Sequence, residues 1–170
     1  MRKTLSTVLL TLLCLLIFAL PVRAEYVLPY PSFMPGNKVY KVTRVIDELR
    51  AYWYWGPLGK VKYHMALADK YLVEAKVLFE YKQYLLAVDA LVRSDTHIRE
   101  APYWIERAAA EGKDVSRLKE IAIEEKLQHI KVLRSIQEQA PEEFTWTPEK
   151  SAPTQLPLHG MLDESIAARE

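Results

Sequence analysis

The residues from Leu58 to Phe79 carry the most regular hydrophobic pattern of the chain. Apolar side chains recur there at alternating steps of three and four, at Leu58, Val61, Met65, Ala68, Leu72, Ala75 and Phe79. This spacing puts them along one face of an α-helix and is typical of the seam between packed helices. Because such a seam needs neighbouring helices to cover it, the pattern predicts an all-α fold with this helix at its centre.

Three further segments show helical spacing, and together they predict a four-helix antiparallel bundle over residues 38–140. The expected helices cover about residues 38–55, 58–81, 84–110 and 115–140. Pro102 lies inside the third, but the apolar phase continues across it, so we expect one kinked helix there. In the first helix, the side chains expected to face inward are Val39, Val42, Ile46, Leu49 and Trp53.

Residues 1–24 have the layout of a secretory signal peptide. Arg2 and Lys3 precede an apolar run, and Ala24 offers a small residue for cleavage. We expect cleavage there and a secreted, periplasmic or cell-surface location. The alternative is a retained membrane anchor, because the uncharged span is close to the lower length limit of a membrane helix. Cleavage would remove Cys14, the only cysteine, and would exclude disulfides and thiolate metal sites from the mature chain.

Charge and motif content exclude several function classes. The chain has 23 basic and 22 acidic residues, interspersed along the predicted helices, whereas nucleic-acid binding asks for a basic excess on one face. It lacks a glycine-rich phosphate loop, a serine in a nucleophile elbow and the Glu-x-x-His pairs of di-iron bundles. We therefore expect a protein that is not an enzyme, binds no nucleic acid and needs no cofactor.

Proline-rich segments flank the predicted bundle on both sides. Residues 25–37 combine three prolines with aromatic side chains, and the prolines keep such a segment extended. We expect Tyr30 and Phe33 to dock on the bundle, which makes this segment a structural strap; the alternative is a proline-rich ligand for a partner's groove. Residues 141–170 contain four prolines among polar residues and predict a mobile tail.

Two of the predicted helices carry polar residues within their apolar stripes. Asp95 lies in the stripe of 84–110, whereas Glu125 and His129, one turn apart, lie in that of 115–140. In an antiparallel hairpin that turns near Gly112, residues equally distant from the turn lie at one level. Asp95 and His129 are equally distant from Gly112, so we expect them to face each other.

This polar layer has three interpretations. A buried polar layer can simply fix the register of packed helices, with its histidine satisfied by a hydrogen bond. Asp95, Glu125 and His129 could instead form a proton-handling or small-ligand site. With Asp69 of the neighbouring helix they could form a metal site rich in oxygen ligands. We expect the structural interpretation, without a bound metal, and we expect His97, outside the stripe, to be solvated.

Four stretches of the chain resemble a known family. They are the opening YVLPYPSFMPGNKVYKV, the helix start Pro57-Leu58 with Lys60, the run ALADKYLVEAK and the later EKLQHIKVL. Together they are similar to domain of unknown function 5667, a family of helical prokaryotic domains that are mostly secreted or membrane-attached. The resemblance covers about residues 26–141. It implies an all-helical extracytoplasmic domain and supplies no activity, substrate or site residues.

Two function classes follow from these observations. The first is a non-enzymatic protein-interaction or structural module outside the cytoplasm, with an unknown protein partner or a second copy of itself. Membrane contact is expected only if residues 1–24 are retained as an anchor. The alternative is a small-ligand or metal-binding bundle that uses the layer of Asp95, Glu125 and His129.

Overall fold

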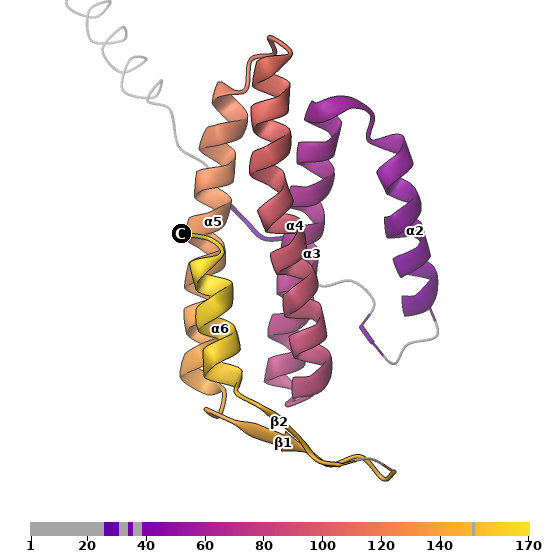
Figure 1. Cartoon of the computed structure of the whole chain (residues 1–170), viewed down its shortest axis with the longest axis vertical. Helices are drawn as coiled ribbons and strands as arrows, with labels where there is room; N and C mark the ends of the chain where they lie inside the picture. The colour runs from indigo at the N-terminus through magenta and orange to yellow at the C-terminus, as the bar shows by residue number, and fades with distance from the viewer. Residues whose placement is uncertain (1–25, 31–33, 36–38, 151) are drawn as a thin grey trace, which may run out of the picture.

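The computed structural model describes residues 26–30, 34–35, 39–150 and 152–170 (Figure 1). These residues form the helices α2 (Tyr40–Trp53), α3 (Gly56–Glu80), α4 (Tyr84–Ala110), α5 (Ser116–Gln139) and α6 (Leu158–Ala167), with the short strands β1 (Phe144–Trp146) and β2 (Thr154–Leu156). The predicted all-α fold with an antiparallel helical bundle is thereby confirmed. Residues 1–24, with the expected cleavage point at Ala24, and Phe33 of the strap lie outside the described residues.

The core lies between α3, α4 and α5. The predicted seam of α3 is buried from Val61 to Phe79, and Leu72 is fully enclosed with Leu91 of α4 and Leu133 of α5. Helix α4 is one helix through Pro102, as its uninterrupted apolar phase predicted. Gly112 ends it with φ +76°, a backbone conformation that glycine adopts without strain, and the chain turns there into α5.

The C-terminal segment differs from its prediction, because residues 141–170 form an ordered part of the fold. Strands β1 and β2 pair as an antiparallel hairpin in which Phe144 is opposite Leu156, and α6 then runs back beside α5 and contacts α4 (Figure 1). Leu158 and Leu162 of α6 are completely buried in the core. Burial of a leucine contributes about 1.5–3 kcal/mol, which offsets the entropy lost when the segment is ordered. The prolines therefore lie at the ends of β1, β2 and α6 and do not prevent these elements from forming.

Helix α2 is the second difference. It stands at the edge of the molecule, beside α3 and away from α5 and α6 (Figure 1). Its expected inward stripe is exposed, by 55% at Val42, 42% at Ile46, 50% at Leu49 and 74% at Trp53, and its only buried residue is Asp47. The apolar period identified correctly which residues share a face, but α6 and not α2 is the fourth helix packed in the core.

The proline-rich strap is held by other residues than expected. Tyr30 is 93% exposed, which corrects its predicted docking on the bundle. Leu28 and Met34 are partly buried against the core, and the Tyr26 hydroxyl reaches Asp69 on α3. No helix in the described part of the chain is long and apolar enough to cross a membrane.

Candidate functional site

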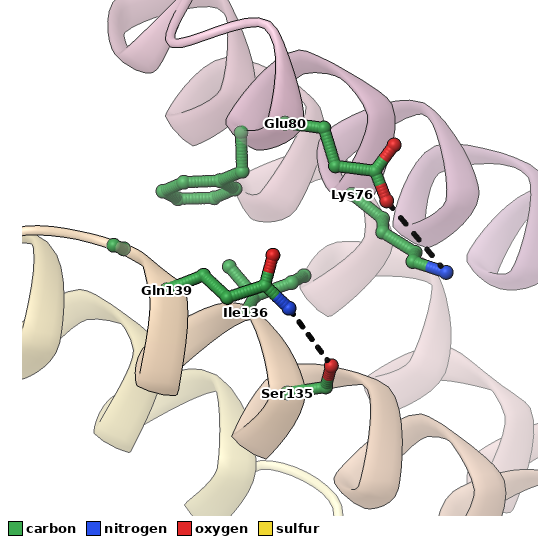
Figure 2. Close-up of a pocket in the computed structure, with 7 residues that line it drawn as sticks. Lys76, Glu80, Ser135, Ile136 and Gln139 are labelled. Carbon is green, nitrogen blue, oxygen red and sulfur yellow. Dashed lines mark hydrogen bonds and ion pairs between the residues drawn. The ribbon is translucent and has the colours of Figure 1, made fainter.

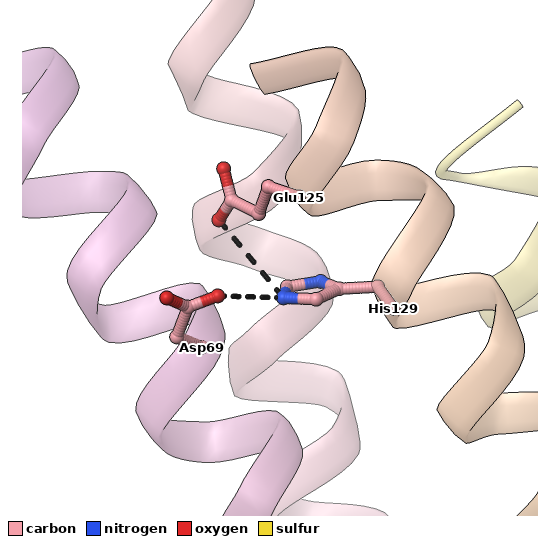
Figure 3. Close-up of side chains that lie close together, drawn as sticks. All are labelled: Asp69, Glu125 and His129. Atoms are coloured by element: carbon pink, nitrogen blue, oxygen red, sulfur yellow. Dashed lines mark hydrogen bonds and ion pairs between the residues drawn. The ribbon is translucent and has the colours of Figure 1, made fainter. Parts of the chain in front are cut away.

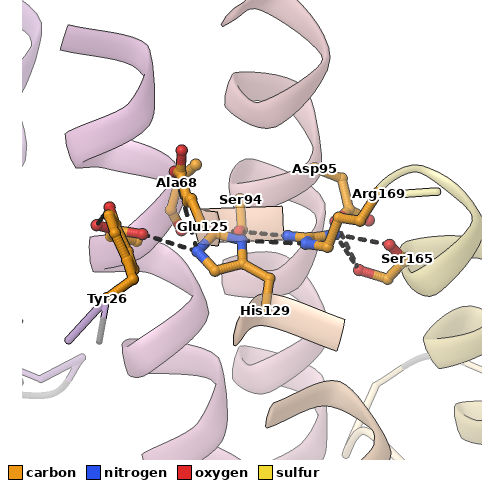
Figure 4. A network of polar contacts seen from close by, with 9 residues as sticks. Tyr26, Ala68, Ser94, Asp95, Glu125, His129, Ser165 and Arg169 are labelled. Atoms are coloured by element: carbon orange, nitrogen blue, oxygen red, sulfur yellow. Dashed lines mark hydrogen bonds and ion pairs between the residues drawn. The ribbon is translucent and has the colours of Figure 1, made fainter. Parts of the chain in front are cut away.

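A buried polar network crosses the core at the level of His129 (Figure 4). It joins the strap, α3, α4, α5 and the end of the chain, which are otherwise far apart in the sequence. The side chains that build it are those of Tyr26, Asp69, Ser94, Asp95, Glu125, His129, Ser165 and Arg169. Four of its members, Ser94, Glu125, His129 and Ser165, have no exposed surface at all, so the network is sealed from solvent near its centre.

His129 occupies the middle of the network with both ring nitrogens engaged. Its Nε2 lies 2.7 Å from Asp69 Oδ1, and Arg169 Nε lies 3.2 Å from its Nδ1. An arginine can only donate, so Nδ1 is the acceptor and the ring proton sits on Nε2, which donates to Asp69. Burial lowers the pKa of His129, and the nearby Arg169 charge acts in the same direction. The imidazole is therefore neutral and held in a single tautomer.

Arg169 connects His129 to α4 and α6. Its Nη1 donates to Asp95 Oδ1 at 2.5 Å and to the Ser165 carbonyl at 2.7 Å, and its Nη2 donates to Ser94 Oγ at 2.7 Å. The guanidinium thus lies between Asp95 and His129, which the sequence placed at one level and in direct contact. The level is right, but the contact runs through Arg169 (Figure 4).

Asp69, Glu125 and His129 form a compact group on the other side of the imidazole (Figure 3). One ligand atom from each lies within 4.8 Å of the others, and His129 Nε2 is 4.0 Å from Glu125 Oε1. Neither Glu125 oxygen has a hydrogen-bond partner among the described residues. Burial raises the pKa of Glu125 to about 9, and the charge on Asp69 adds to the effect. Glu125 is therefore protonated at neutral pH.

Tyr26 closes the group from the strap. Its hydroxyl donates to Asp69 Oδ2 at 2.6 Å, while Asp69 Oδ1 receives the His129 proton. The pKa of Tyr26 is raised by its burial and by this hydrogen bond. Each oxygen of the Asp69 carboxylate thus has one donor, and the strap is fastened to α3 by its first described residue.

The two carboxylates and the imidazole could hold a divalent cation, but Arg169 opposes it. A cation on His129 Nε2 would displace the proton from that nitrogen and leave it on Nδ1. The Nδ1 proton would then meet the Arg169 Nε–H, and two donors would face each other. Metal-bound histidines normally donate their second nitrogen to a carboxylate or carbonyl. The geometry thus argues against a metal centre. It favours a layer whose polar groups are linked by hydrogen bonds and fix the register of the helices.

The sequence predicted a group of Asp69, Asp95, Glu125 and His129, but not the residues that connect them. Arg169 and Ser165 were assigned to a mobile tail, and Tyr26 was not distinguished from the other strap aromatics. The available signal for Arg169 was an arginine directly after the apolar residues Ile166, Ala167 and Ala168, in a chain whose predicted helices carry carboxylates within their apolar stripes.

His97 corrects the expectation of a solvated side chain. Its Nδ1 lies 3.1 Å from Nδ1 of His64, and its ring stacks on Tyr71 with centroids 5.8 Å apart. Burial, with the neighbouring His64, lowers the pKa of His97 to about 4. His97 also borders a cavity of about 190 Å³ between α2, α3 and α4 that Tyr63 and Asp47 line. The two neutral imidazoles form one hydrogen bond with each other and pack between α3 and α4.

A notch between α3 and α5 offers no room for a ligand (Figure 2). It encloses about 30 Å³, and the residues that line it are Lys76, Phe79, Glu80, Ser135, Ile136, Gln139 and Ala140. The Lys76–Glu80 ion pair, 3.8 Å, lies at its rim. A cavity of this size accommodates one or two water molecules, whereas small-molecule sites occupy about 300–1,000 Å³.

Comparison with known proteins adds a family and nothing more specific. A family model described as Domain of unknown function (DUF5667) matches residues 32–143. No curated protein and no solved structure matches the chain. The match confirms the resemblance that the opening segment and the α3 sequence predicted.

Proposed function

The chain belongs to the DUF5667 family, and from that premise we propose that it is a non-enzymatic interaction module outside the cytoplasm that receives a protein partner on helix α2. The observation that carries the proposal is the orientation of this helix. Stepping about 100° per residue, Val39, Val42, Ile46, Leu49 and Trp53 fall on one side, and Val45 and Tyr52 widen it to an arc of about 140°. All seven side chains are between 42% and 78% exposed. We call them the α2 face.

The opposite, polar side of α2 is the side that holds it to the bundle. The Tyr40 hydroxyl donates to Glu74 at 2.6 Å, and Asp47 forms an ion pair with Lys70. Near the end of the helix, Lys60 donates to the Ala51 carbonyl at 2.7 Å. These contacts fix the helix with its apolar side outward. Because the hydrophobic effect disfavours such exposure in a monomer, the arrangement supports a function in which another surface covers the α2 face.

The buried network supports a structural role for the polar layer. A catalytic group has to reach its substrate, whereas His129 and Glu125 have no exposed surface and Arg169 has 2%. The hydrogen bonds of Arg169 to His129, Asp95 and Ser94 join the end of α6 to α5 and α4. The layer therefore serves to fix the register of α3, α4, α5 and α6, as buried polar residues do in other helical assemblies.

The proposed location rests on residues 1–24. Their two basic residues, apolar run and Ala24 have the order of a secretory signal. Detection of the mature N-terminus at Glu25 in the exported fraction is expected. A protein found only inside the cytoplasm with Met1 intact would contradict this part of the proposal.

Chemical cross-linking in producing cells tests the interaction. We expect a cross-linked species of higher mass that Val42→Glu abolishes. Val92→Glu is the matched control, because Val92 on α4 is 58% exposed against 55% for Val42 and is not part of the α2 face. Loss of the species in both variants, or its absence from the unchanged protein, would refute the proposal.

A metal or ligand site at Asp69, Glu125 and His129 remains the second candidate. The observation in its favour is that both Glu125 oxygens are buried without partners. Against it stands the Arg169 donor on His129 Nδ1. We expect elemental analysis of the purified protein to find no stoichiometric metal and added Zn²⁺ to leave its thermal unfolding unchanged. A stoichiometric metal that His129→Leu removes would decide for the metal site.

A further inference from the structure

We propose that the partner of the α2 face is a second copy of this chain, with the two α2 helices packed antiparallel. This inference rests on the proposed function, because it identifies the occupant of the same surface. Three properties of the face distinguish a second copy from a membrane or an unrelated surface: its period, its complementarity to itself and the charges at its rim.

The α2 face has the period of a helix–helix seam. Val39, Val42, Ile46, Leu49 and Trp53 alternate in steps of three and four, which is the a/d pattern of coiled coils. The same pattern in α3 is buried by neighbouring helices of the chain. In α2 it is complete over two heptads and exposed. A seam of this kind packs against another helix with the same period. The α2 helix of a second copy carries such a seam.

An antiparallel arrangement makes the face complementary to itself. In antiparallel coiled coils an a position of one helix packs against a d position of the other. Aligning Ile46 with Leu49 of the second copy also aligns Val42 with its Trp53, so that the smallest seam residue of α2 meets the largest. Val45 then lies beside Tyr52 of the second copy. The central layers pair Ile46 with Leu49, which are equal in size, and the outer layers pair Val42 with Trp53, so no layer contains two bulky aromatics.

The α2 face offers much of the area of a standard dimer interface. Tyr52 and Trp53 are 78% and 74% exposed, which at about 200 Å² each leaves roughly 300 Å² of aromatic surface. The half-exposed aliphatic residues add on the order of 300 Å². The sum, roughly 600 Å², is about three quarters of the roughly 800 Å² that each partner contributes to a standard interface. It lies at the upper end of the roughly 300–600 Å² that the largest apolar patch of a monomer covers.

The charges around the face favour a protein over a bilayer. Lys41 and Glu48 occupy one rim, and Arg50 on the other lies 3.7 Å from Asp47. Mixed signs of this kind suit a polar rim where two protein surfaces meet. Helices that lie on anionic membranes instead carry mostly Lys and Arg on the polar face. The polar face of α2 is moreover already bound to α3.

Sedimentation equilibrium of the purified full chain tests the oligomeric state. We expect a reversible monomer–dimer equilibrium that Val42→Glu weakens by at least about 100-fold, since a charge is then buried twice per dimer. Val92→Glu serves as the control of similar exposure, 58% against 55% for Val42, and should leave the equilibrium unchanged. Equal helical content and thermal unfolding of both variants would show that the fold is intact.

Disulfide cross-linking tests the register, in a Cys14→Ser background that contains no other cysteine. We expect chains with Val42→Cys to cross-link rapidly to chains with Trp53→Cys. Chains with Val42→Cys alone should cross-link slowly, because residues 42 of the two copies are then separated by about 16 Å along the helices. Fast cross-linking of Val42→Cys to itself would indicate a parallel pair and overturn the antiparallel register.

The outcomes also separate this inference from the proposed function. A protein that stays monomeric at all concentrations, yet loses a cellular cross-linked partner through Val42→Glu, overturns the second copy and keeps the interaction module. Binding to anionic vesicles that Val42→Glu abolishes and Val92→Glu preserves assigns the α2 face to a membrane and also overturns the second copy. A monomer without either property refutes both proposals.

Discussion

Replacing Arg169 tests the ordered C-terminus and the buried layer together. The side chain is 2% exposed, and its guanidinium donates to His129, Asp95, Ser94 and Ser165. In Arg169→Ala, the Asp95 carboxylate loses its countercharge and His129 Nδ1 loses its donor.

The magnitude follows from the partners that are left behind. Removal of one member of a buried ion pair costs about 3–5 kcal/mol, because the remaining charge is desolvated without compensation. Asp95 keeps the Ser165 hydroxyl at 2.6 Å, and its side chain is 14% exposed, so the value for Arg169→Ala lies at the lower end, about 3 kcal/mol. Such a loss is a large fraction of the 5–15 kcal/mol by which domains are usually stable. Arg169→Lys should recover little of it, because an ammonium cannot reproduce the forked contacts of a guanidinium.

Urea unfolding followed by circular dichroism measures the effect. The control is Arg117→Ala, which removes an arginine whose side chain is 76% exposed and paired with Glu120 at 3.1 Å; its free energy of unfolding should match that of the unchanged protein. Hydrogen exchange should also show faster exchange throughout α6 in Arg169→Ala, because Arg169 joins this helix to α4 and α5. If Arg169→Ala changed the free energy of unfolding by less than about 1 kcal/mol, the C-terminal segment would not be anchored as described.

Two other changes address the network from its opposite side. Tyr26→Phe should lower the free energy of unfolding by about 1–2 kcal/mol, because Asp69 loses a donor, whereas Tyr30→Phe should have no effect; equal effects in urea unfolding would contradict the assignment. Unfolded Glu125 ionises near its ordinary pKa of 4.5 but the folded group near 9, so stability falls as pH rises between these values, by on the order of 1 kcal/mol per pH unit. Glu125→Gln should flatten this dependence and be the more stable protein at pH 8, and parallel pH profiles from pH 5 to 8 would refute the raised pKa.

The helices were predictable because their apolar period is local. In α3 the same side chains that repeat every three or four residues are the ones buried against α4 and α5, and in α4 the phase identified a single helix through Pro102. The level of Asp95 and His129 followed from the Gly112 turn alone. Both predictions depend only on the helical period and on counting residues from one turn, and both can be read from the sequence.

The partners of the polar layer were not predictable in the same way. Arg169 reaches His129 only because the hairpin of β1 and β2 returns the chain to the core, and that return depends on the burial of Leu158 and Leu162. The sequence of a proline-rich segment does not show whether its apolar residues pack on the core or stay exposed to water. Tertiary packing decided the outcome, and local propensity carried no information about it.

Helices α2 and α3 show that an apolar period alone does not predict whether that face is buried within the chain. The contacts made by the opposite face of the helix supply this information. Both carry a three-four seam, and from the seam alone both were expected to face inward. In α3 the seam is the contact to the rest of the chain. In α2 the contact to the rest of the chain is made by Tyr40, Asp47 and the Ala51 carbonyl, which lie on the other side of the helix. A helix has only two broad sides, so when polar side chains with partners on its own domain occupy one, the apolar side is left exposed, which is why we propose that another surface covers it in α2.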